Sequence, residues 1–164
     1  MSSSYHTRQA ASHRDSSRHK GQSSSSQPAQ GMVFQVEINP PKRITQGATL
    51  PWNIVATLCP RPSDSTTTAI YSATLVQESR TNTPFQGAVF SCADEWVSPH
   101  NDTKAYFVFP RDLVIDSPPG RYYFSLSLSR IDVSTGLSAQ LMNATSTSFE
   151  VTSQFVQLPN DPCK

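Results

Sequence analysis

Few side chains in this sequence are suited to proton transfer, and their positions do not favour catalysis. Three of the four histidines stand in a serine-rich N-terminal segment: His6, His13 and His19. Only His100 stands among the apolar segments, within Ser98–Asp102, whose composition is typical of an exposed loop. A catalytic histidine must be held against its substrate, so we predict that His100 is a surface residue rather than a general base.

The other reactive residue types are equally scattered. Asp94 and Glu95 are adjacent carboxylates, and in an extended strand they would point to opposite faces and could not share a substrate. The phosphate-binding patterns G-x-x-x-x-G-K and G-x-G-x-x-G do not occur. Cys59, Cys92 and Cys163 lack the spacing of metal ligands. We therefore predict a protein that is not an enzyme, with no catalytic residues, metal site, cofactor or small-molecule substrate.

Lys42 and Arg43 are the candidate DNA-binding residues, because Lys and Arg side chains neutralise phosphates. They stand in the loop between the first two predicted strands. Specific DNA contact usually needs more than two phosphate anchors, so a solvated charge pair stays open as the alternative. Arg121 and Arg130 are not expected to form a patch with each other, because without a bulge their opposite parity puts them on opposite faces of a continuous strand.

The clearest structural pattern follows Gly120, where apolar and polar residues alternate. One parity carries Tyr122, Phe124, Leu126 and Leu128, and the other carries Arg121, Tyr123, Ser125, Ser127 and Ser129. Because successive side chains of a strand point to opposite faces, we predict a central strand whose apolar side packs in the core. The serine side then faces solvent or a partner, and Tyr123, Ser125 and Ser127 are the candidate partner-binding residues.

Short strands are predicted along most of the chain. Alternating apolar residues occur in Phe34–Ile38 and Trp52–Leu58, and further strands are predicted at about 69–76, 86–92, 105–109, 120–130 and 147–156. Thirteen prolines punctuate the sequence, and no long 3.6-residue apolar period with capping residues occurs. This pattern predicts an all-β fold, an antiparallel β-sandwich whose two sheets pack their apolar faces together.

A turn is predicted immediately before the alternating strand, at Pro118-Pro119-Gly120. Proline fixes φ and glycine accepts positive φ, so the three residues suit a tight reversal. Asp116, Gly120 and Tyr122 are similar to the corner at the end of immunoglobulin-like sandwiches. Phe124 occupies the position of the cysteine that would follow in an antibody domain, so the predicted sandwich lacks that disulfide.

The N-terminal segment differs from the rest of the chain. Residues 1–30 include ten serines and no Leu, Ile, Val, Phe or Trp, too little apolar surface to offset the entropy of ordering. We predict a disordered tail at 1–31, a β-sandwich domain at 32–158 and a C-terminal tail at 159–164. An import signal or a phosphorylation target is the alternative to plain disorder in the first tail.

The charge distribution and the hydropathy limit the partners. Residues 1–31 carry a net +3 and the remaining 133 residues a net −2, so the folded part has no broad excess of basic residues for nucleic acid. No apolar stretch has the length of a signal peptide's core or a membrane span. The sequence therefore predicts a soluble, intracellular protein with no membrane contact.

Several segments resemble the velvet-domain family of fungal regulators. Ala105–Leu113, AYFVFPRDL, is similar to that family's FvFPdLsv segment, and Pro119–Leu126, PGRYYFSL, is similar to its pGrYrLrFsL segment. Looser similarity occurs in Asn39–Gly47, Gln86–Gly87 and Ala144–Val151. The resemblance extends over residues 33–156 in matching order, and the first two segments are the most specific.

The resemblance implies an immunoglobulin-like sandwich similar to Rel-homology domains, homo- or heterodimers with velvet proteins, and a nuclear role in sporulation and secondary metabolism. It also leaves room for shuttling to the cytoplasm. DNA contact in the family uses basic residues early in the domain, where only Lys42 and Arg43 stand here. The arginine- and lysine-rich insertion and the KkFPG element after the last strand are missing. We therefore expect a regulator that acts mainly by pairing, with DNA contact as a second hypothesis and a non-nuclear adaptor or degenerate copy as a third.

Overall fold

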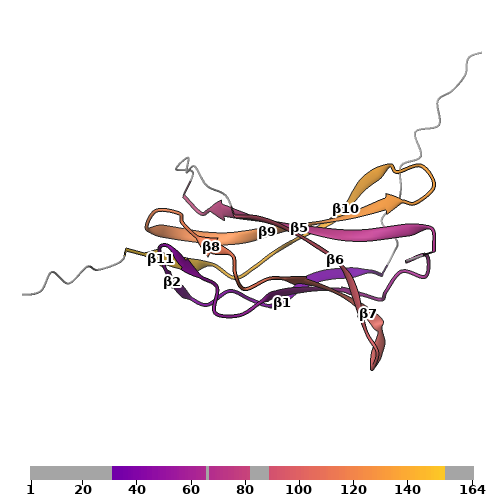
Figure 1. Cartoon of the computed structure of the whole chain (residues 1–164), viewed down its shortest axis with the longest axis horizontal. Coiled ribbons are helices and arrows are strands. Elements are labelled where there is room, and N and C mark those ends of the chain that lie inside the picture. Colours follow the sequence, from indigo (N-terminus) through magenta and orange to yellow (C-terminus); the bar gives the residue numbers. More distant parts are fainter. Residues whose placement is uncertain (1–30, 66, 82–88, 154–164) are drawn as a thin grey trace, which may run out of the picture.

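The computed structural model describes residues 31–65, 67–81 and 89–153, without the side chains of Asn101 and Asp102. Within these residues every regular element is a strand, and the strands form two facing layers that join into one curled sheet (Figure 1). The predicted all-β, sandwich-like fold is thus confirmed. The predicted tails at 1–31 and 159–164 fall, apart from Gly31, outside the described residues and stay predictions.

The first layer contains four antiparallel strands. Their spatial order is β1 (Val33–Ile38), β4 (Ile54–Cys59), β7 (Asn101–Phe109) and β6 (Phe90–Ser98). Alternate residues of β4 and β7 supply fully buried side chains to the core: Ile54, Ala56, Leu58, Ala105, Phe107 and Phe109. Burial of every second residue follows from the two-residue period of a strand.

The second layer is arranged around β9. It contains β5 (Ala69–Ser79), β9 (Gly120–Asp132), β10 (Ser138–Thr145), β11 (Phe149–Thr152) and β2 (Arg43–Thr45). One edge of β9 pairs with β5, and its other edge pairs with β11 near its start and with β10 over the rest. Outside both layers, β3 (Ala48–Thr49) pairs with β8 (Val114–Ile115).

The pairing of β2 with β11 is parallel, so the prediction of a wholly antiparallel sandwich is wrong at this edge. An antiparallel pair can be closed by a short hairpin, whereas a parallel pair needs a long connection. Here more than a hundred residues separate β2 from β11, so no hairpin dictates their direction. The consequence is that the first part of the chain lies beside its last described strand.

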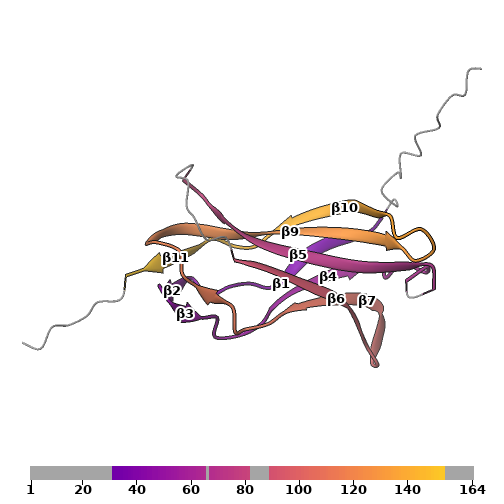
Figure 2. The ribbon, with the colours of Figure 1, turned by 45° about the horizontal axis from the view of Figure 1, so that its top comes forward.

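Strand β6 belongs to both layers. Its first half pairs with β5, through Phe90 to Asp94, and its second half pairs with β7, where Glu95 and Trp96 lie opposite Phe107 and Tyr106. Figure 2 shows β6 passing from the side of β5 to the side of β7. A shared strand leaves no open sheet edge on this side of the sandwich.

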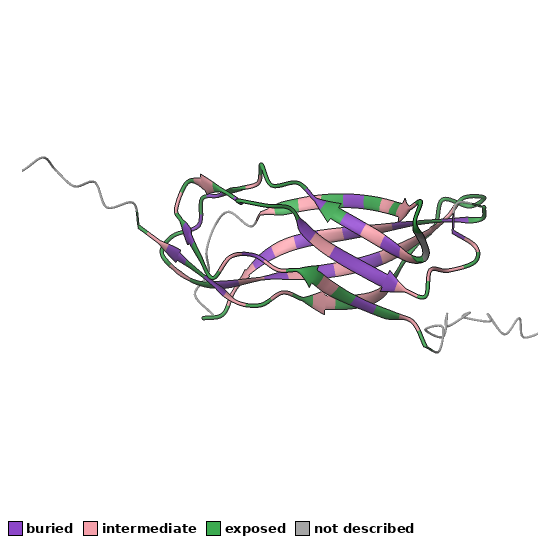
Figure 3. Cartoon of the chain, turned by 90° about the horizontal axis from the view of Figure 1, so that it is seen from below, coloured by how far each residue is buried: buried purple, intermediate pink, exposed green. Residues whose placement is uncertain are grey.

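The predicted two-faced strand is confirmed in β9. Tyr122, Phe124, Leu126 and Leu128 are buried, whereas Tyr123, Ser125, Ser127 and Ser129 are only half-buried on the outer side. Figure 3 shows such alternation of buried and less buried residues along strands of the sandwich. The rings of Phe124 and Phe149 pack with centroids 4.9 Å apart, which fixes β11 against β9. The inner side of β9 therefore belongs to the core.

The turn before β9 is present, but the positive φ that was predicted for Gly120 is not. A Cβ at this position would lie 3.4 Å from the ring of Tyr122. The Tyr122 hydroxyl donates a hydrogen bond of 2.8 Å to the Pro118 carbonyl, and the buried Gln77 amide donates one of 2.6 Å to the Ser117 hydroxyl. A Cβ at Gly120 would thus make only ordinary van der Waals contact with the ring, and nothing in the described part of the structure requires glycine at this position.

Several predicted boundaries are wrong. The strand predicted at 86–92 is β6, which begins at Phe90, and residues 86–88 lie outside the described residues. The loop predicted at Ser98–Asp102 is a tight turn of Pro99 and His100 between β6 and β7, in which His100 is exposed as predicted. β10 has no counterpart among the predicted strands, because none of its residues is fully buried and no inner face marks its sequence.

Candidate binding surface

Strand pairing brings together basic residues that are far apart in the sequence. Glu150 of β11 lies opposite Arg43 of β2 on one side and opposite Arg121 of β9 on the other. Directly opposed residues of neighbouring strands project from the same face of a sheet. Arg43 and Arg121 therefore flank Glu150 on the outer face of the second layer.

Two further cations join this row. The Arg80 amide, just beyond the end of β5, donates a 3.0 Å hydrogen bond to the Arg121 carbonyl. The Lys42 carbonyl accepts a 2.9 Å hydrogen bond from the Glu150 amide. The side chains of Lys42, Arg43, Arg80 and Arg121 are all exposed, and we call these four residues the basic end.

The basic end includes both predicted DNA-binding residues and two that sequence reasoning missed. Arg121 was separated from Lys42 and Arg43 by about eighty residues, and only the parallel pairing of β2 with β11 brings it near them. Arg80 lies about four residues beyond the end of the strand predicted at about 69–76, because β5 continues to Ser79. Arg130 lies near the other end of β9, where its guanidinium forms an ion pair with Asp64 at 2.9 Å. Arg130 and Arg121 therefore do not form one patch, as predicted.

The electrostatics of the basic end leave most of its charge uncompensated. Arg43 and Glu150 form an ion pair of 3.2 Å between Nε and Oε2, and both side chains are exposed, so the pair stabilises the fold little. No ion pair within the described residues involves Lys42, Arg80 or Arg121. Two carboxylates, Glu150 and Glu78, lie on the same face as these four cations.

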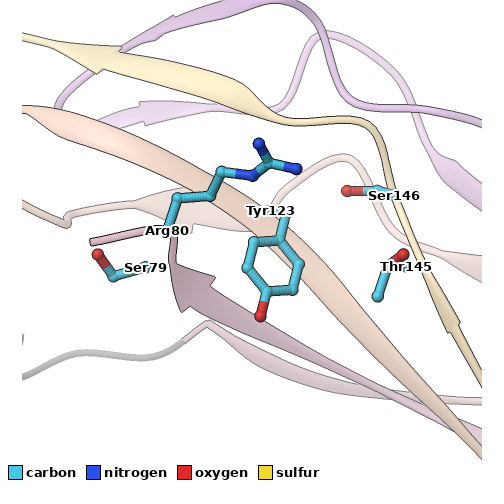
Figure 4. Close-up of a pocket in the computed structure, with 5 residues that line it drawn as sticks. All are labelled: Ser79, Arg80, Tyr123, Thr145 and Ser146. Atoms are coloured by element: carbon cyan, nitrogen blue, oxygen red, sulfur yellow. The ribbon is translucent and has the colours of Figure 1, made fainter. Parts of the chain in front are cut away.

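Two hollows lie along this region. The first, of about 690 Å³, is lined by Lys42, Arg43, Arg121 and residues 147–150. The second, of about 470 Å³, is lined by Ser79, Arg80, Tyr123, Thr145 and Ser146 (Figure 4). Cationic groups and hydroxyls at the rim of an open hollow are suited to bind an anion such as phosphate.

The candidate partner-binding residues continue along the same outer face. Tyr123 follows Arg121 at the same parity, and its hydroxyl donates a 2.5 Å hydrogen bond to Glu78. This hydrogen bond raises the pKa of Tyr123 above its ordinary value. Ser125 and Ser127 lie next along β9. Ser127 lies between Thr74 of β5 and Asn143 of β10, and Ser125 lies between Val76 of β5 and Thr145 of β10. The two sites predicted separately therefore form one surface, basic at one end and rich in hydroxyls beyond it.

Nothing in this surface is arranged as a nucleophile with its base. His100 lies in the turn between β6 and β7, away from the basic end. Among the described residues, no group of three or more His, Cys, Asp or Glu side chains is placed to hold a metal ion. That part of the chain also contains no helix with the length and apolar character that a bilayer crossing requires. The cations and hydroxyls of this surface are suited to binding anions.

Comparison with known proteins gives distant structural likenesses. No family model and no curated protein matches the chain. A ceramidase complexed with C2 matches with a TM-score of 0.38 and 14% identity, over 75% of this chain and 19% of that one. The neutral ceramidase from Pseudomonas aeruginosa gives 0.38 and 16%, over 77% and 20%. The chain thus spans about a fifth of these ceramidase chains.

A third likeness is to a structure titled for fibronectin binding and biofilm formation by the AAF fimbriae of enteroaggregative Escherichia coli. The TM-score is 0.38 and the identity 13%, over 74% of this chain and 99% of that chain. Likenesses at this level leave both family and function open.

Proposed function

We propose that the protein is a velvet-type nuclear regulator that acts mainly by pairing with another velvet domain. The support is the sequence resemblance together with the position of its two most specific segments. Ala105–Leu113 contains the second half of β7, and Pro119–Leu126 contains the first half of β9. Both segments therefore lie in inner strands of the two layers, β7 between β4 and β6 and β9 between β5 and β11.

A binding role is supported by the polar and basic side chains that the outer face of the second layer exposes. The described hollows are open surface features, and the outer face of the second layer displays Tyr123, Ser125 and Ser127 beside the basic end. Such an open surface is suited to contact a macromolecule, whereas a small substrate is usually enclosed in a pocket. In this proposal the protein is not an enzyme and works in the nucleus, with shuttling to the cytoplasm.

The test is capture of a velvet partner. The tagged full chain is incubated with extract of a filamentous fungus, and bound proteins are identified by mass spectrometry. We expect another velvet-domain protein at stoichiometric amounts, and fluorescence of the tagged chain in nuclei. A chain that captures no velvet protein and stays outside nuclei contradicts the proposal and favours an adaptor or degenerate copy.

Direct DNA contact is a second candidate function, and the gathering of Arg80 and Arg121 beside Lys42 and Arg43 favours it. Each phosphate contact to duplex DNA contributes about −0.9 to the slope of log affinity against log salt, so four cations give a slope of about −3.6. Affinity is measured by fluorescence anisotropy across salt concentrations. The double change Arg80→Ala/Arg121→Ala should reduce the slope by about 1.8.

A matched control removes the same type of charge elsewhere. Arg111 is exposed and lies after β7, with its amide bonded to Asn53 at 3.0 Å, outside the basic end. Arg111→Ala should leave the salt slope unchanged. Equal salt slopes for the wild type and the Arg80→Ala/Arg121→Ala variant would show that these arginines do not contact DNA phosphates.

A further inference from the structure

An exposed phenylalanine lies on the outer face of the second layer, close to the basic end. Phe90, at the start of β6, is 64% exposed, and it lies opposite Val76 of β5, which in turn lies opposite Ser125 of β9. Directly opposed residues project from the same face of a sheet. Ala93, three residues further along β6, is buried in the core, so Phe90 has the outer parity. The ring of Phe90 is therefore presented to solvent on the same face as the basic end.

The strand registers give the spacing between this ring and the cations. Arg80 follows Val76 by four residues, and its amide donates a 3.0 Å hydrogen bond to the carbonyl of Arg121. Residues of one parity recur about every 6.6 Å along a strand, so the row of Phe90 lies roughly 13 Å from the row of the two arginines.

The charges of this face differ on the two sides of the exposed ring. The arginines of the basic end lie on one side, and exposed Asp94 lies four residues along β6 on the other. Glu78 and Glu150 also lie on the basic side, and each already accepts a hydrogen bond from a neighbouring side chain. An anionic group of a partner is therefore attracted to the basic end and repelled from the side of Asp94.

The residue types on this face are those of an interface. Aromatic residues and arginine are enriched where proteins contact one another, and Arg80, Arg121, Tyr123 and Phe90 stand here within three successive rows. Figure 4 shows Arg80 and Tyr123 at the rim of the hollow of about 470 Å³. The face thus combines a site for an anion with an apolar contact at a fixed distance from it.

We propose that this face binds an extended peptide segment of a partner protein, with an anionic side chain at the basic end and a large apolar side chain against Phe90. Carboxylate and phosphate share the chemistry that arginine recognises. Side chains on one face of an extended segment recur every second residue, so a spacing of roughly 13 Å corresponds to an anionic and an apolar residue four positions apart. In an α-helix four positions span only about 6 Å. This inference rests on the proposed function, because it gives the chemistry of the partner segment that contacts this surface.

Duplex DNA is the competing occupant of the basic end. Its phosphates would contact the cations, but they would make no favourable contact with the ring of Phe90 and would bring negative charge toward Glu78 and Asp94. Dependence of binding on Phe90 therefore separates a peptide from duplex DNA.

Nuclear magnetic resonance titration of the isotope-labelled full chain with synthetic peptides tests the proposal. Each peptide has about nine serine and threonine residues, enough to span the two rows, with one residue replaced by glutamate or phosphoserine and another by leucine. Leucine stands four positions from the anion, on either side, in the test peptides and three positions from it in the controls, where an extended chain turns the two to opposite faces. We expect the amides of β5, β9 and Phe90 to shift with the test peptides, and the controls to bind about fivefold more weakly.

Two substitutions test the two contacts separately. Arg121→Gln keeps the length of the side chain and removes its charge, and it should weaken binding of the test peptides about tenfold. Phe90→Ser removes the ring and should weaken binding about fivefold. The matched controls Arg111→Gln and Trp96→Ser remove an arginine and an exposed aromatic ring elsewhere and should bind like the wild type. Circular dichroism checks that each variant keeps its fold.

The outcomes separate the possible occupants. Tighter binding of phosphoserine than of glutamate peptides identifies a phosphorylated partner and equal binding an acidic one, and either supports the proposal. Equal affinity for both spacings, or for wild type and Phe90→Ser, overturns it, and competition by duplex DNA would then assign the basic end to DNA. Shifts at Phe90 that depend on protein concentration without peptide would overturn it in favour of a second copy.

Failure of this inference can be told apart from failure of the proposed function. A chain that captures a velvet protein but binds none of these peptides loses only the inference. A chain that binds the test peptides as described but captures no velvet protein loses only the proposed function.

Discussion

At the scale of single residues, Asp132 shows how one carboxylate organises a turn. One of its oxygens accepts hydrogen bonds from the amides of Ser134 and Thr135, at 3.0 and 2.9 Å, and from both of their hydroxyls. The hydroxyl of Ser134 contributes most, and together these bonds lower the pKa of Asp132 to about 2. Gly136, with φ of 68°, then completes the connection from β9 to β10.

The lowered pKa of Asp132 predicts a pH dependence of stability. An aspartate in the unfolded chain titrates near 3.9, so the folded state favours the ionised form. The resulting stabilisation is present above about pH 4 and is lost as the pH falls from about 4 to about 2. Urea unfolding at several pH values should show this loss in the wild type and a smaller one in Asp132→Asn. If the free energy of unfolding falls equally with pH in the wild type and in Asp132→Asn, the turn contributes nothing to the pH dependence of stability.

Tyr122 yields a second prediction at this scale. Its hydroxyl bonds to the Pro118 carbonyl at 2.8 Å, while its ring lies in the core. Tyr122→Phe keeps the ring and removes the hydroxyl, so the free energy of unfolding should fall by about 1 kcal/mol. Chemical denaturation measures the change, and Tyr106→Phe on the outer side of β7 is the control. A fall no larger than that of the control would show that the corner bond adds nothing.

At the scale of elements, an ion pair fixes the loop between β4 and β5 to the shared strand. Arg61 contacts Glu95 of β6 at 2.7 Å, and the Glu95 side chain is only 5% exposed. The Ser65 hydroxyl also donates to this carboxylate. Glu95 lies on the inner side of β6, so the loop neutralises a charge that the strand would otherwise bury unpaired.

Replacement of Arg61 should therefore lower the free energy of unfolding. Arg61→Met leaves the Glu95 carboxylate without its cation and should lower the free energy of unfolding by about 3 kcal/mol. The double variant Arg61→Met/Glu95→Met should recover most of that loss, because neither charge remains to be desolvated. Urea denaturation of the two single variants and the double variant measures the coupling. Additive effects would contradict a direct interaction between the two residues.

The sequence predicted elements whose pattern is local, and missed those that depend on distant pairing. The two faces of β9 could be read because apolar residues alternate with serine over the strand. β10 could not, because it is an edge strand that buries no side chain completely. The basic end was half predicted: Lys42 and Arg43 are neighbours in sequence, but the register of β2, β11 and β9, which adds Arg121, is set by contacts across the whole fold.

At the scale of the whole molecule, one core connects both layers. The buried cluster includes residues of the first layer, such as Phe107, and of the second, such as Phe124 and Phe149. Strand β6 adds backbone hydrogen bonds to both layers. Neither layer can therefore lose its pairing without exposing the apolar side of the other.

This arrangement predicts a single cooperative unfolding transition. Both tryptophans, Trp52 before β4 and Trp96 in β6, are placed to report on the first layer, whereas far-UV circular dichroism reports on all strands. Thermal and urea curves followed by tryptophan fluorescence and by circular dichroism should coincide. A fluorescence transition that precedes the dichroism transition would show that the first layer melts by itself.

The tight turn of Pro99 and His100 marks a natural place to divide the chain into two complementary fragments. A fragment that ends there keeps β6 but lacks its neighbour β7, and it also lacks β9, on which β5 depends. The other fragment has β7 and β9 without the strands that lie between them. Each piece would carry unpaired backbone along a full strand, so the fragments should remain unstructured apart and assemble when mixed, which is the property that a split reporter protein needs.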